Sequence, residues 1–293
     1  MTQHAYLFPG QGAQFVGMGK DLYYTHQHAQ SLFQQANQIL GFDITEWMFA
    51  GSEEALQQTH IAQPAIFIHS TVLAAVTPDF NPAMVAGHSL GELSALVASG
   101  VLTFEAGLRL VMARSKAMQQ ACEEQPGAMA AVLGLSDEIV QTTCGHIPDL
   151  VIPANYNCPW QIVISGTTAG VAAACAHLQE AGAKKVVPLK VAGGFHSPLM
   201  KTAQAQLKAA IDQTTFQQGI CPIYQNATGL PTDDPLQIQA QLLEQLISPV
   251  LWTQTIQHMI DDGASSFVEC GPGKVLQGLV KKINPQVAIA GIA

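Results

Sequence analysis

Basic residues are scarce in this 293-residue sequence, which has 12 lysines and arginines against 21 aspartates and glutamates and a formal net charge of −9. Proteins that bind the nucleic-acid backbone concentrate positive charge, so this balance argues against a nucleic-acid partner. Any anionic substrate must instead be met by a small local group of cations. Only two arginines occur, Arg109 and Arg114, and both fall in one predicted helix.

Paired cysteines and long apolar runs are missing as well. The six cysteines are scattered, with no Cys-x-x-Cys and no paired Cys/His spacing, which argues against a disulfide framework and a zinc site. No apolar run reaches the length of a membrane span, and no basic, apolar leader opens the sequence. We therefore expect a cytoplasmic protein with no metal and no membrane partner.

Short apolar strands alternate with amphipathic helices over most of the chain, which predicts a largely parallel sheet covered by helices on both faces. Residues 127–191 instead follow the order βαββαβ, which is that of a ferredoxin-like split unit. The turn-forming segments Gln125-Pro126-Gly127 and Gly193-Gly194 flank this part. We predict a discontinuous main domain, residues 1–126 and 192–293, with a ferredoxin-like subdomain inserted at 127–191.

The segment Gly87-His88-Ser89-Leu90-Gly91 has the Gly-x-Ser-x-Gly pattern of a nucleophile elbow. An apolar strand precedes it and an apolar-periodic helix follows, which is the order that such a turn requires. The turn strains the backbone and brings it close to its neighbours, so side chains at 87 and 91 would collide. Ser89 is therefore the candidate nucleophile.

A serine hydroxyl needs a nearby base, most often histidine. Among ten histidines, His196 alone stands in a tight loop between a predicted strand and a predicted helix, where sites form in α/β sheets. His88 adjoins Ser89, but successive side chains point apart, so we reject it. The acids between Ser89 and His196 fall in the inserted part, in no convincing loop. A dyad whose histidine is oriented by a main-chain carbonyl is therefore an alternative to a triad.

Two glycine-rich loops do not fit nucleotide-binding motifs. After Gly10-Gln11-Gly12, a dinucleotide fingerprint would need glycine where Phe15 stands. After Gly271-Pro272-Gly273-Lys274, a phosphate loop would need serine or threonine where Val275 stands. Both loops require another explanation.

The two arginines face different sides of the helix predicted from Thr103 to Cys122. Arg109 can form an exposed pair with Glu105, one turn earlier. Arg114 falls beside the apolar face, where its guanidinium would suit a carboxylate gripped by two parallel hydrogen bonds. An arginine that extends past the core edge, or that pairs with a structural acid, remains an alternative.

Several further motifs occur in a recognisable order along the whole chain. They are Phe8-Pro9-Gly10-Gln11-Gly12-Ala13-Gln14, Thr59 through Gln63-Pro64-Ala65, Gly87-His88-Ser89-Leu90-Gly91-Glu92, the Arg114 helix, Asn155-Tyr156-Asn157-Cys158-Pro159, Gly194-Phe195-His196-Ser197-Pro198 and Glu269-Cys270-Gly271-Pro272-Gly273-Lys274. In these motifs the chain resembles the malonyl-CoA:acyl carrier protein transacylases of bacterial fatty-acid synthesis. The resemblance implies an α/β-hydrolase-like core with a ferredoxin-like insertion.

The resemblance also implies a role for each matching residue. Ser89 would carry the malonyl group and His196 would be its base, in a ping-pong transfer from malonyl-CoA to acyl carrier protein without a bound cofactor. The remaining roles follow the family's motifs: the backbone N–H groups of Gln11 and Leu90 as oxyanion hole, Arg114 as carboxylate clamp, Phe195, Met118 and Gln63 as further substrate-binding residues, and the Leu251 carbonyl as the acceptor that orients His196. Phe195 resembles malonyl-selective members, in which the ring crowds a branch at the α-carbon.

Two positions depart from the family's pattern. Relatives commonly have glutamine or arginine at the position assigned to Leu251, and glycine where Trp160 stands. The family's carrier protein is acidic, so a local basic patch is expected, with lysine candidates at Lys184, Lys185, Lys190, Lys274, Lys281 and Lys282. Three alternatives stay open: a thioester hydrolase on the same scaffold, a non-catalytic binding relative, and a transferase that serves a polyketide carrier. Arg114 argues against a hydrolase for uncharged acyl groups, and the presence of Ser89 and His196 argues against a non-catalytic role.

Overall fold

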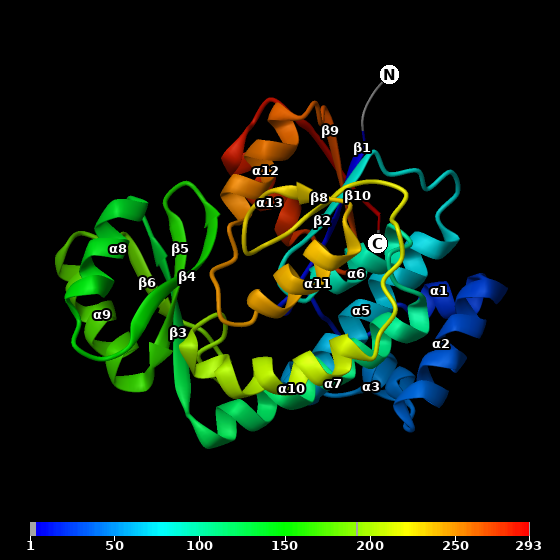
Figure 1. The fold of residues 1–293 in the computed structure, drawn as a ribbon, viewed down its shortest axis with the longest axis horizontal. Helices are drawn as coiled ribbons and strands as arrows, with labels where there is room; N and C mark the ends of the chain where they lie inside the picture. Colours follow the sequence, from blue (N-terminus) through cyan, green and yellow to red (C-terminus); the bar gives the residue numbers. More distant parts are fainter. Residues whose placement is uncertain (1–3, 192, 293) are drawn as a thin grey trace.

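A computed structural model describes residues 4–191 and 193–292, which form two sheets with their helices (Figure 1). The larger sheet has the strand order β10-β9-β1-β2-β7-β8 and is parallel except for the β7–β8 pair. Its strands are β1 (His4–Phe8), β2 (Met84–Gly87), β7 (Ile223–Tyr224), β8 (Pro231–Thr232), β9 (Ser266–Cys270) and β10 (Ala288–Ile292). The prediction of an α/β protein with a largely parallel sheet is confirmed.

Helices cover both faces of this sheet. Successive side chains of a strand point to opposite faces, and apolar side chains on each face are buried in a core of their own. Phe8 and Val85 contribute to one hydrophobic core, and Leu7, Met84 and Ala86 contribute to another. The helices of the main part are α1 (Lys20–Thr25), α2 (Gln27–Leu40), α3 (Ile44–Ala50), α4 (Glu53–Gln57), α5 (Thr59–Val76), α6 (Gly91–Ala98), α7 (Phe104–Glu124), α10 (Lys201–Asp212), α11 (Pro235–Glu244), α12 (Trp252–Asp261) and α13 (Val275–Ile283), with a 3₁₀ turn at Pro198–Met200. The larger core lies under α2, α5, α6 and α7, and α12 and α13 close the smaller one.

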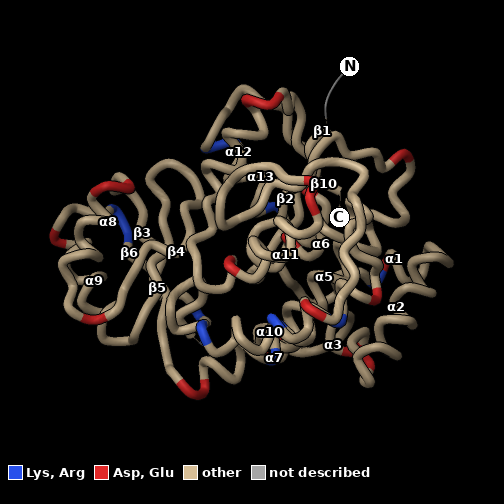
Figure 2. The backbone as a smooth tube through the Cα atoms, in the orientation of Figure 1, with Lys and Arg blue, Asp and Glu red and all other residues tan. Residues whose placement is uncertain are grey.

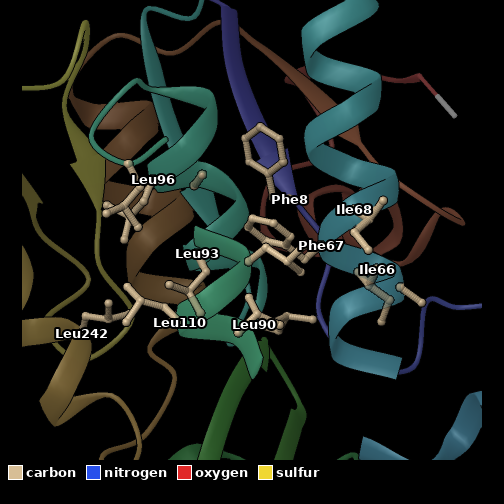
Figure 3. Packing of buried hydrophobic residues seen from close by; sticks show 14 of the residues in the cluster. Phe8, Ile66, Phe67, Ile68, Leu90, Leu93, Leu96, Leu110 and Leu242 are labelled. Atoms are coloured by element: carbon tan, nitrogen blue, oxygen red, sulfur yellow. The ribbon is translucent and has the colours of Figure 1, made fainter. Parts of the chain in front are cut away.

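The core under the nucleophile turn is dense and apolar. Figure 3 shows Phe8 of β1 and Phe67 of α5 beside Leu90 and Leu93, which lie at the start of α6. Full burial of a leucine side chain contributes about 1.5–3 kcal/mol. These contacts therefore hold the first turn of α6 firmly against the end of β1.

Helix α5 is long and apolar enough to cross a membrane by length and composition, which corrects the expectation that no apolar segment reaches that length. Most of it, 83 %, is buried inside the protein. It packs between α2 and α7, and its side chains belong to the larger core (Figure 1). Its apolar composition is therefore accounted for by its central place among the helices.

The smaller sheet is antiparallel, with the strand order β4-β5-β3-β6. Its elements follow the order β3 (Gly127–Leu133), α8 (Asp137–His146), β4 (Val151–Cys158), β5 (Gln161–Thr167), α9 (Thr168–Glu180) and β6 (Lys185–Pro188). Ser136 and Thr167 cap the two helices by accepting hydrogen bonds from backbone N–H groups of the first turn. The two helices pack on this sheet over a core of their own, at the left of Figure 1.

Backbone hydrogen bonds attach β4 to the main part. The Tyr156 N–H donates to the Val250 carbonyl at 2.9 Å, and the Val250 N–H donates to the Ala154 carbonyl at 2.8 Å. Thr253 Oγ1 also donates to the Tyr156 carbonyl. This short parallel bridge fixes the inner edge of the smaller sheet relative to the start of α12.

Candidate active site

Ser89 lies on a sharp turn between the end of β2 and the start of α6, as the motif predicts. Its φ angle is 52°, in the left-handed region that a non-glycine residue rarely adopts. A side chain on Gly87 would collide with the backbone of Gly91, and a side chain on Gly91 would collide with the carbonyl of Phe8. The two glycines therefore let the turn approach the end of β1, which leaves the serine hydroxyl at the edge of the sheet.

His196 lies next to this serine. Its Nε2 is 2.7 Å from Ser89 Oγ, and its Nδ1 is 2.9 Å from the backbone carbonyl of Gln245. A carbonyl oxygen can only accept, so Nδ1 carries the proton and Nε2 is left free to accept one from the serine. The pair is a dyad oriented by a main-chain carbonyl, which was the alternative to a triad.

The predicted role of Leu251 is wrong. Its carbonyl accepts from the backbone N–H and from Oγ1 of Thr255, in the first turn of α12. Gln245, which directly follows α11, supplies the carbonyl instead. Gln245 stands six positions before Leu251, so the side chain at position 251 has no bearing on the orientation of His196.

Burial sets the protonation state of the base. His196 is buried, and desolvation, together with the nearby Arg114 guanidinium, lowers its pKa to about 3. The imidazole therefore stays neutral at ordinary pH, as a general base must be before it takes a proton.

Arg114 extends from α7 into the protein and is 1 % exposed. Its Nη2 donates to Ser89 Oγ at 3.1 Å and to Gln245 Oε1 at 3.0 Å, and its Nη1 donates to Gln63 Oε1 at 2.9 Å. No carboxylate lies within salt-bridge distance of this guanidinium in the described part of the chain. A buried cation held by neutral oxygens beside a nucleophile is suited to an incoming anion.

Arg109 shows what the same residue type does on the opposite face of α7. It pairs with Glu105 at 2.9 Å, and its side chain is 60 % exposed. An exposed pair of this kind contributes little to stability. The predicted division of the two arginines between solvent and interior is confirmed.

Gln63 connects the clamp to the first glycine loop. Its Oε1 accepts from Arg114, and its Nε2 lies 3.4 Å from Gln11 Oε1 and 3.6 Å from Met118 Sδ. Gln63 and Met118 are both buried, and both line the cleft beside Ser89. The structure thus brings together these two predicted substrate-binding residues.

The backbone N–H groups of Gln11 and Leu90 both border the cleft. Neither donates a hydrogen bond to another group within residues 4–191 and 193–292. The Leu90 side chain is anchored in the core (Figure 3), which fixes the direction of its backbone. Free N–H groups beside a nucleophile can stabilise an oxyanion that develops on a bound carbonyl group.

A cleft of about 600 Å³ opens over the serine, between the main part and the smaller sheet. Phe195 lines it directly before the base, and Asn155 and Asn157 of β4 line the opposite wall. His88 Nε2 lies 2.8 Å from Asn157 Oδ1, so this histidine faces away from the serine hydroxyl and is rejected as the base for the predicted reason.

Trp160 lies in the turn between β4 and β5. Its side chain is 60 % exposed, it does not line the cleft, and its φ angle is 66°. The neighbouring Gln161 does line the cleft. Glycine, which the resemblance leads one to expect here, would adopt this left-handed backbone without strain.

The second glycine-rich loop serves a structural purpose. Glu269, at the end of β9, accepts from the backbone N–H groups of Leu276 and Gln277 in the first turn of α13. The loop turns the chain so that this carboxylate can satisfy the helix N-terminus. No group of three or more potential metal ligands occurs among the described residues.

Two further residues of the site were not singled out from the sequence. Gln245 orients His196 and also binds the Ser89 carbonyl through Nε2 at 3.0 Å. Asn226 contacts the nucleophile turn from the loop after β7. Their only local signal in the sequence is a polar residue just after a short apolar strand or helix, and their burial becomes visible only in the structure.

Comparison with known proteins agrees with this geometry. Residues 5–289 match the model of the acyl transferase domain family. A malonyl CoA-acyl carrier protein transacylase of Bacillus subtilis is 41 % identical over 302 residues, covering 100 % of this chain and 94 % of that protein.

Solved structures give the same result. A malonyl-CoA:acyl carrier protein transacylase from Xanthomonas oryzae superposes with a TM-score of 0.95 at 39 % identity, covering 100 % of this chain and 96 % of the other. A malonyl-transacylase solved in complex with a type II polyketide acyl-carrier protein gives a TM-score of 0.96 at 35 % identity, covering 99 % of this chain and 96 % of the other. The chain therefore belongs to the acyl transferase domain family.

Proposed function

We propose that this protein transfers the malonyl group from malonyl-CoA to the phosphopantetheine thiol of acyl carrier protein, through a malonyl-serine intermediate at Ser89, and so supplies extender units for fatty-acid synthesis. One observation carries the proposal. The hydroxyl that a neutral histidine can deprotonate is the same atom that a buried arginine, free of any acidic partner in the described chain, contacts at 3.1 Å. The names of the relatives in B. subtilis and X. oryzae support it.

The transfer takes two steps of the same chemistry. Ser89 Oγ attacks the thioester carbonyl carbon while His196 Nε2 takes its proton, and the tetrahedral oxyanion accepts from the N–H groups of Gln11 and Leu90. The C–S bond then breaks, and coenzyme A leaves with the proton from His196. In the second step the carrier thiol gives its proton to His196 and attacks the ester, and Ser89 recovers the proton when the C–O bond breaks.

Arg114 would bind the malonyl carboxylate. Its Nη2 now donates to Ser89 Oγ and Gln245 Oε1, and these neutral acceptors bind a guanidinium less strongly than a carboxylate does. The arriving anion would draw Nη2 away from the serine. Burial lowers the pKa of Arg114 to about 10, which leaves it cationic at neutral pH.

We also infer the finer classification of the fold. The smaller sheet, with the order β4-β5-β3-β6, supports a ferredoxin-like subdomain at residues 127–191. The elbow at the end of β2 supports an α/β-hydrolase-like core built from residues 1–126 and 192–293. The boundary residues 1, 192 and 293 lie outside the described residues.

For the carrier protein we infer a docking surface at the mouth of the cleft. Lys190 lines the cleft, and Lys282 Nζ donates to Oε1 of Gln161, which also lines it. Most acidic positions lie at the outer edge of the molecule, and basic ones are few (Figure 2). Lys190→Glu should slow transfer to the carrier more than acylation by malonyl-CoA, and Lys20→Glu, on α1, should slow neither. Equal slowing of both half-reactions by Lys190→Glu would reject this surface.

We infer no bound cofactor and no metal, because serine, histidine and backbone N–H groups suffice for acyl transfer. We further infer a cytoplasmic location, without a nucleic-acid or membrane partner, from the acidic composition and the burial of α5.

Service to a polyketide carrier is the second candidate function. It is favoured by one observation, the likeness to a malonyl-transacylase solved with a type II polyketide acyl-carrier protein. The chemistry is the same for both carriers. Transfer rates to a fatty-acid carrier and to a polyketide carrier, measured side by side, separate the two functions.

The first experiment mixes the protein with malonyl-CoA and phosphopantetheinylated acyl carrier protein and quantifies malonyl-carrier and free malonate. Malonyl-carrier with little malonate, abolished in Ser89→Ala, is the expected result. Ser94→Ala removes a buried hydroxyl from α6, the helix that follows the nucleophile turn, and should keep full activity. Serine-dependent malonate that does not require the carrier would establish a thioester hydrolase instead.

A further inference from the structure

Asn226 uses all of its polar groups beside the nucleophile. Its Oδ1 accepts from the Ser89 N–H at 2.6 Å, and its Nδ2 donates to the Gly87 carbonyl at 2.7 Å. Its own backbone N–H donates to Glu92 Oε2 at 2.7 Å, and its carbonyl accepts from the Leu251 N–H at 2.9 Å. The residue is completely buried, so none of these bonds competes with water.

We infer that Asn226 is a positioning residue for the proposed transfer: its side chain spans the nucleophile turn from Gly87 to Ser89 and holds the serine in its left-handed conformation. The inference rests on the proposed function only in the identity of the substrate. The turn itself is required for any chemistry at Ser89.

The turn needs such a positioning residue because its backbone at Ser89 is strained. A left-handed conformation at a non-glycine residue is strained, and it persists only where the surroundings impose it. Adjacent strands β2 and β7 are parallel, so the loop after β7 begins beside the end of β2. Asn226 lies two residues after β7 and reaches the turn without further rearrangement.

Asn226 also separates the roles of two neighbouring N–H groups, those of Ser89 and Leu90. Because the Ser89 N–H is bonded to Asn226, it does not compete for the acyl oxygen. The next N–H group, that of Leu90, is left free at the cleft. Displacement of Asn226 would therefore disturb both the nucleophile and the oxyanion hole.

An amide fits both partners at any pH, because it accepts through Oδ1 and donates through Nδ2 without titrating. A carboxylate at position 226 would accept from Ser89 but would repel the Gly87 carbonyl and the Glu92 carboxylate. A protonated carboxyl group would restore both bonds, with its hydroxyl donating to Gly87. Asn226→Asp should thus be impaired at neutral pH and recover as the pH falls.

Glu92, on α6, holds the backbone of Asn226 in place. Besides binding the Asn226 N–H, its Oε1 lies 3.4 Å from Gln225 Nε2. Burial raises the pKa of Glu92 to about 7. The ionisable groups around the turn, Glu92, Arg114, His88 and His196, are the same in wild type and variant, so the ratio of their rates reports the carboxyl group introduced at position 226 together with its coupling to Glu92.

The test measures the rate at which a fluorophosphonate probe labels Ser89 between pH 5 and 8, together with kcat and KM for malonyl-CoA. Ser89 Oγ forms a bond to phosphorus, fluoride leaves, and His196 takes the proton, so labelling requires the turn but no malonyl group. Asn226→Ala and Asn226→Asp should label about ten- to a hundredfold more slowly at pH 8, with kcat lowered more than KM changes. The Asn226→Asp to wild-type ratio should rise at least fivefold toward pH 5.

Asn37→Asp is the matched control. Asn37 likewise donates, to Asp43, and accepts, from the Ile44 N–H, but it lies in the last turn of α2, away from the serine. This variant should lose some thermal stability and label at the wild-type rate at every pH.

A flat Asn226→Asp to wild-type ratio across this range, or wild-type labelling by Asn226→Ala, overturns the inference. If Asn226→Ala does not fold, the pH dependence of the Asp variant decides alone. Failure of the proposed function is a separate result: wild type would then label with the probe but form no malonyl-enzyme.

Discussion

The two sheets border the same cleft but contribute different kinds of groups. In the larger sheet, β1, β2 and β7 are parallel neighbours, and the residues that follow their carboxyl ends include Gln11, Ser89 and Asn226. The smaller sheet is antiparallel and supplies wall residues such as Met129 and Asn155. Ends of adjacent parallel strands meet at one edge, so they can gather reacting groups from distant segments, whereas an antiparallel sheet distributes its strand ends over two edges.

This difference predicts where substitutions should act. Changes at the edge of the larger sheet should lower the rate of the chemical step. Changes around the smaller sheet should alter access, docking or stability and leave the chemical step intact.

Loss of the base should have the largest effect. His196→Asn should lower acylation by malonyl-CoA about 10³-fold, because no other group accepts the proton of Ser89. Asparagine tolerates the φ angle of 56° at this position better than alanine would, so the variant tests the base rather than the backbone. Stopped-flow or quenched-flow acylation measures the rate.

The matched control for this prediction is His258→Asn. His258 also bonds a backbone carbonyl through Nδ1, that of Gly229, and lies on α12 away from the serine. It should acylate at the wild-type rate. Comparable losses in both variants would contradict the assignment of His196 as base.

Removal of the arginine clamp comes next. Arg114→Met should reduce kcat/KM for malonyl-CoA about a hundredfold, because the malonyl carboxylate loses its charge-assisted hydrogen bonds. Acetyl-CoA, which lacks that carboxylate, should lose much less, so the malonyl-to-acetyl ratio is the diagnostic measurement. Arg109→Met, on the solvent face of α7, should change neither rate. An equal loss for both thioesters in Arg114→Met would assign this arginine to the serine rather than to the substrate.

Selectivity against branched acyl groups should be the next largest effect. Wild type should use methylmalonyl-CoA poorly, and Phe195→Ala should raise the methylmalonyl-to-malonyl ratio of kcat/KM about tenfold, because the ring no longer crowds the added methyl group. Phe216→Ala removes an equally buried ring that does not line the cleft, so it should leave the ratio unchanged. Equal wild-type rates for the two thioesters would disprove the role of Phe195.

The pH dependence of acylation should be shallow. Burial and the Arg114 guanidinium lower the pKa of His196 to about 3, so the neutral base is lost only when the pH falls toward that value. Single-turnover acylation should change less than about threefold between pH 8 and pH 5. A histidine with an ordinary pKa of about 6.5 would lose about tenfold for each pH unit below it. A decline of that steepness in the wild-type acylation rate would contradict the buried environment of His196.

The smallest effect is expected at the hairpin of the smaller sheet. Trp160→Gly should leave malonyl transfer within twofold of wild type and should raise the free energy of unfolding by about 0.5–1 kcal/mol, because glycine adopts the left-handed backbone without strain. Trp47→Gly, within helix α3, should instead lower it by about 1 kcal/mol or more. Slower acylation by Trp160→Gly, at unchanged stability, would mean that the smaller sheet does affect the chemical step.

The elbow and the base could be predicted because their signals are local. Gly87, Ser89 and Gly91 form a motif whose sterics act within five residues, and His196 stands in a short loop with turn-forming neighbours. The helix caps at Thr103 and Ser136 were predictable for the same reason, since each side chain binds a backbone N–H three residues later.

The carbonyl that orients His196 could not be assigned in the same way. Any residue offers a carbonyl oxygen, and only the packing of α11 against the serine loop selects Gln245 over Leu251. Asn226 was missed for a related reason: its partners, Gly87 and Ser89, are more than 130 residues away in the chain.

By itself, the sequence determined the αβ alternation, the strained turn at Ser89 and the presence of one arginine on each face of α7, because periodicity and turn sterics depend on neighbours in the chain. The tertiary structure decided which oxygen holds His196, which amide holds the turn, and that Arg114 contacts Ser89 rather than an acid. Those choices depend on distances between segments that the sequence separates, and only the packing of helices and parallel strand ends against one another sets these distances.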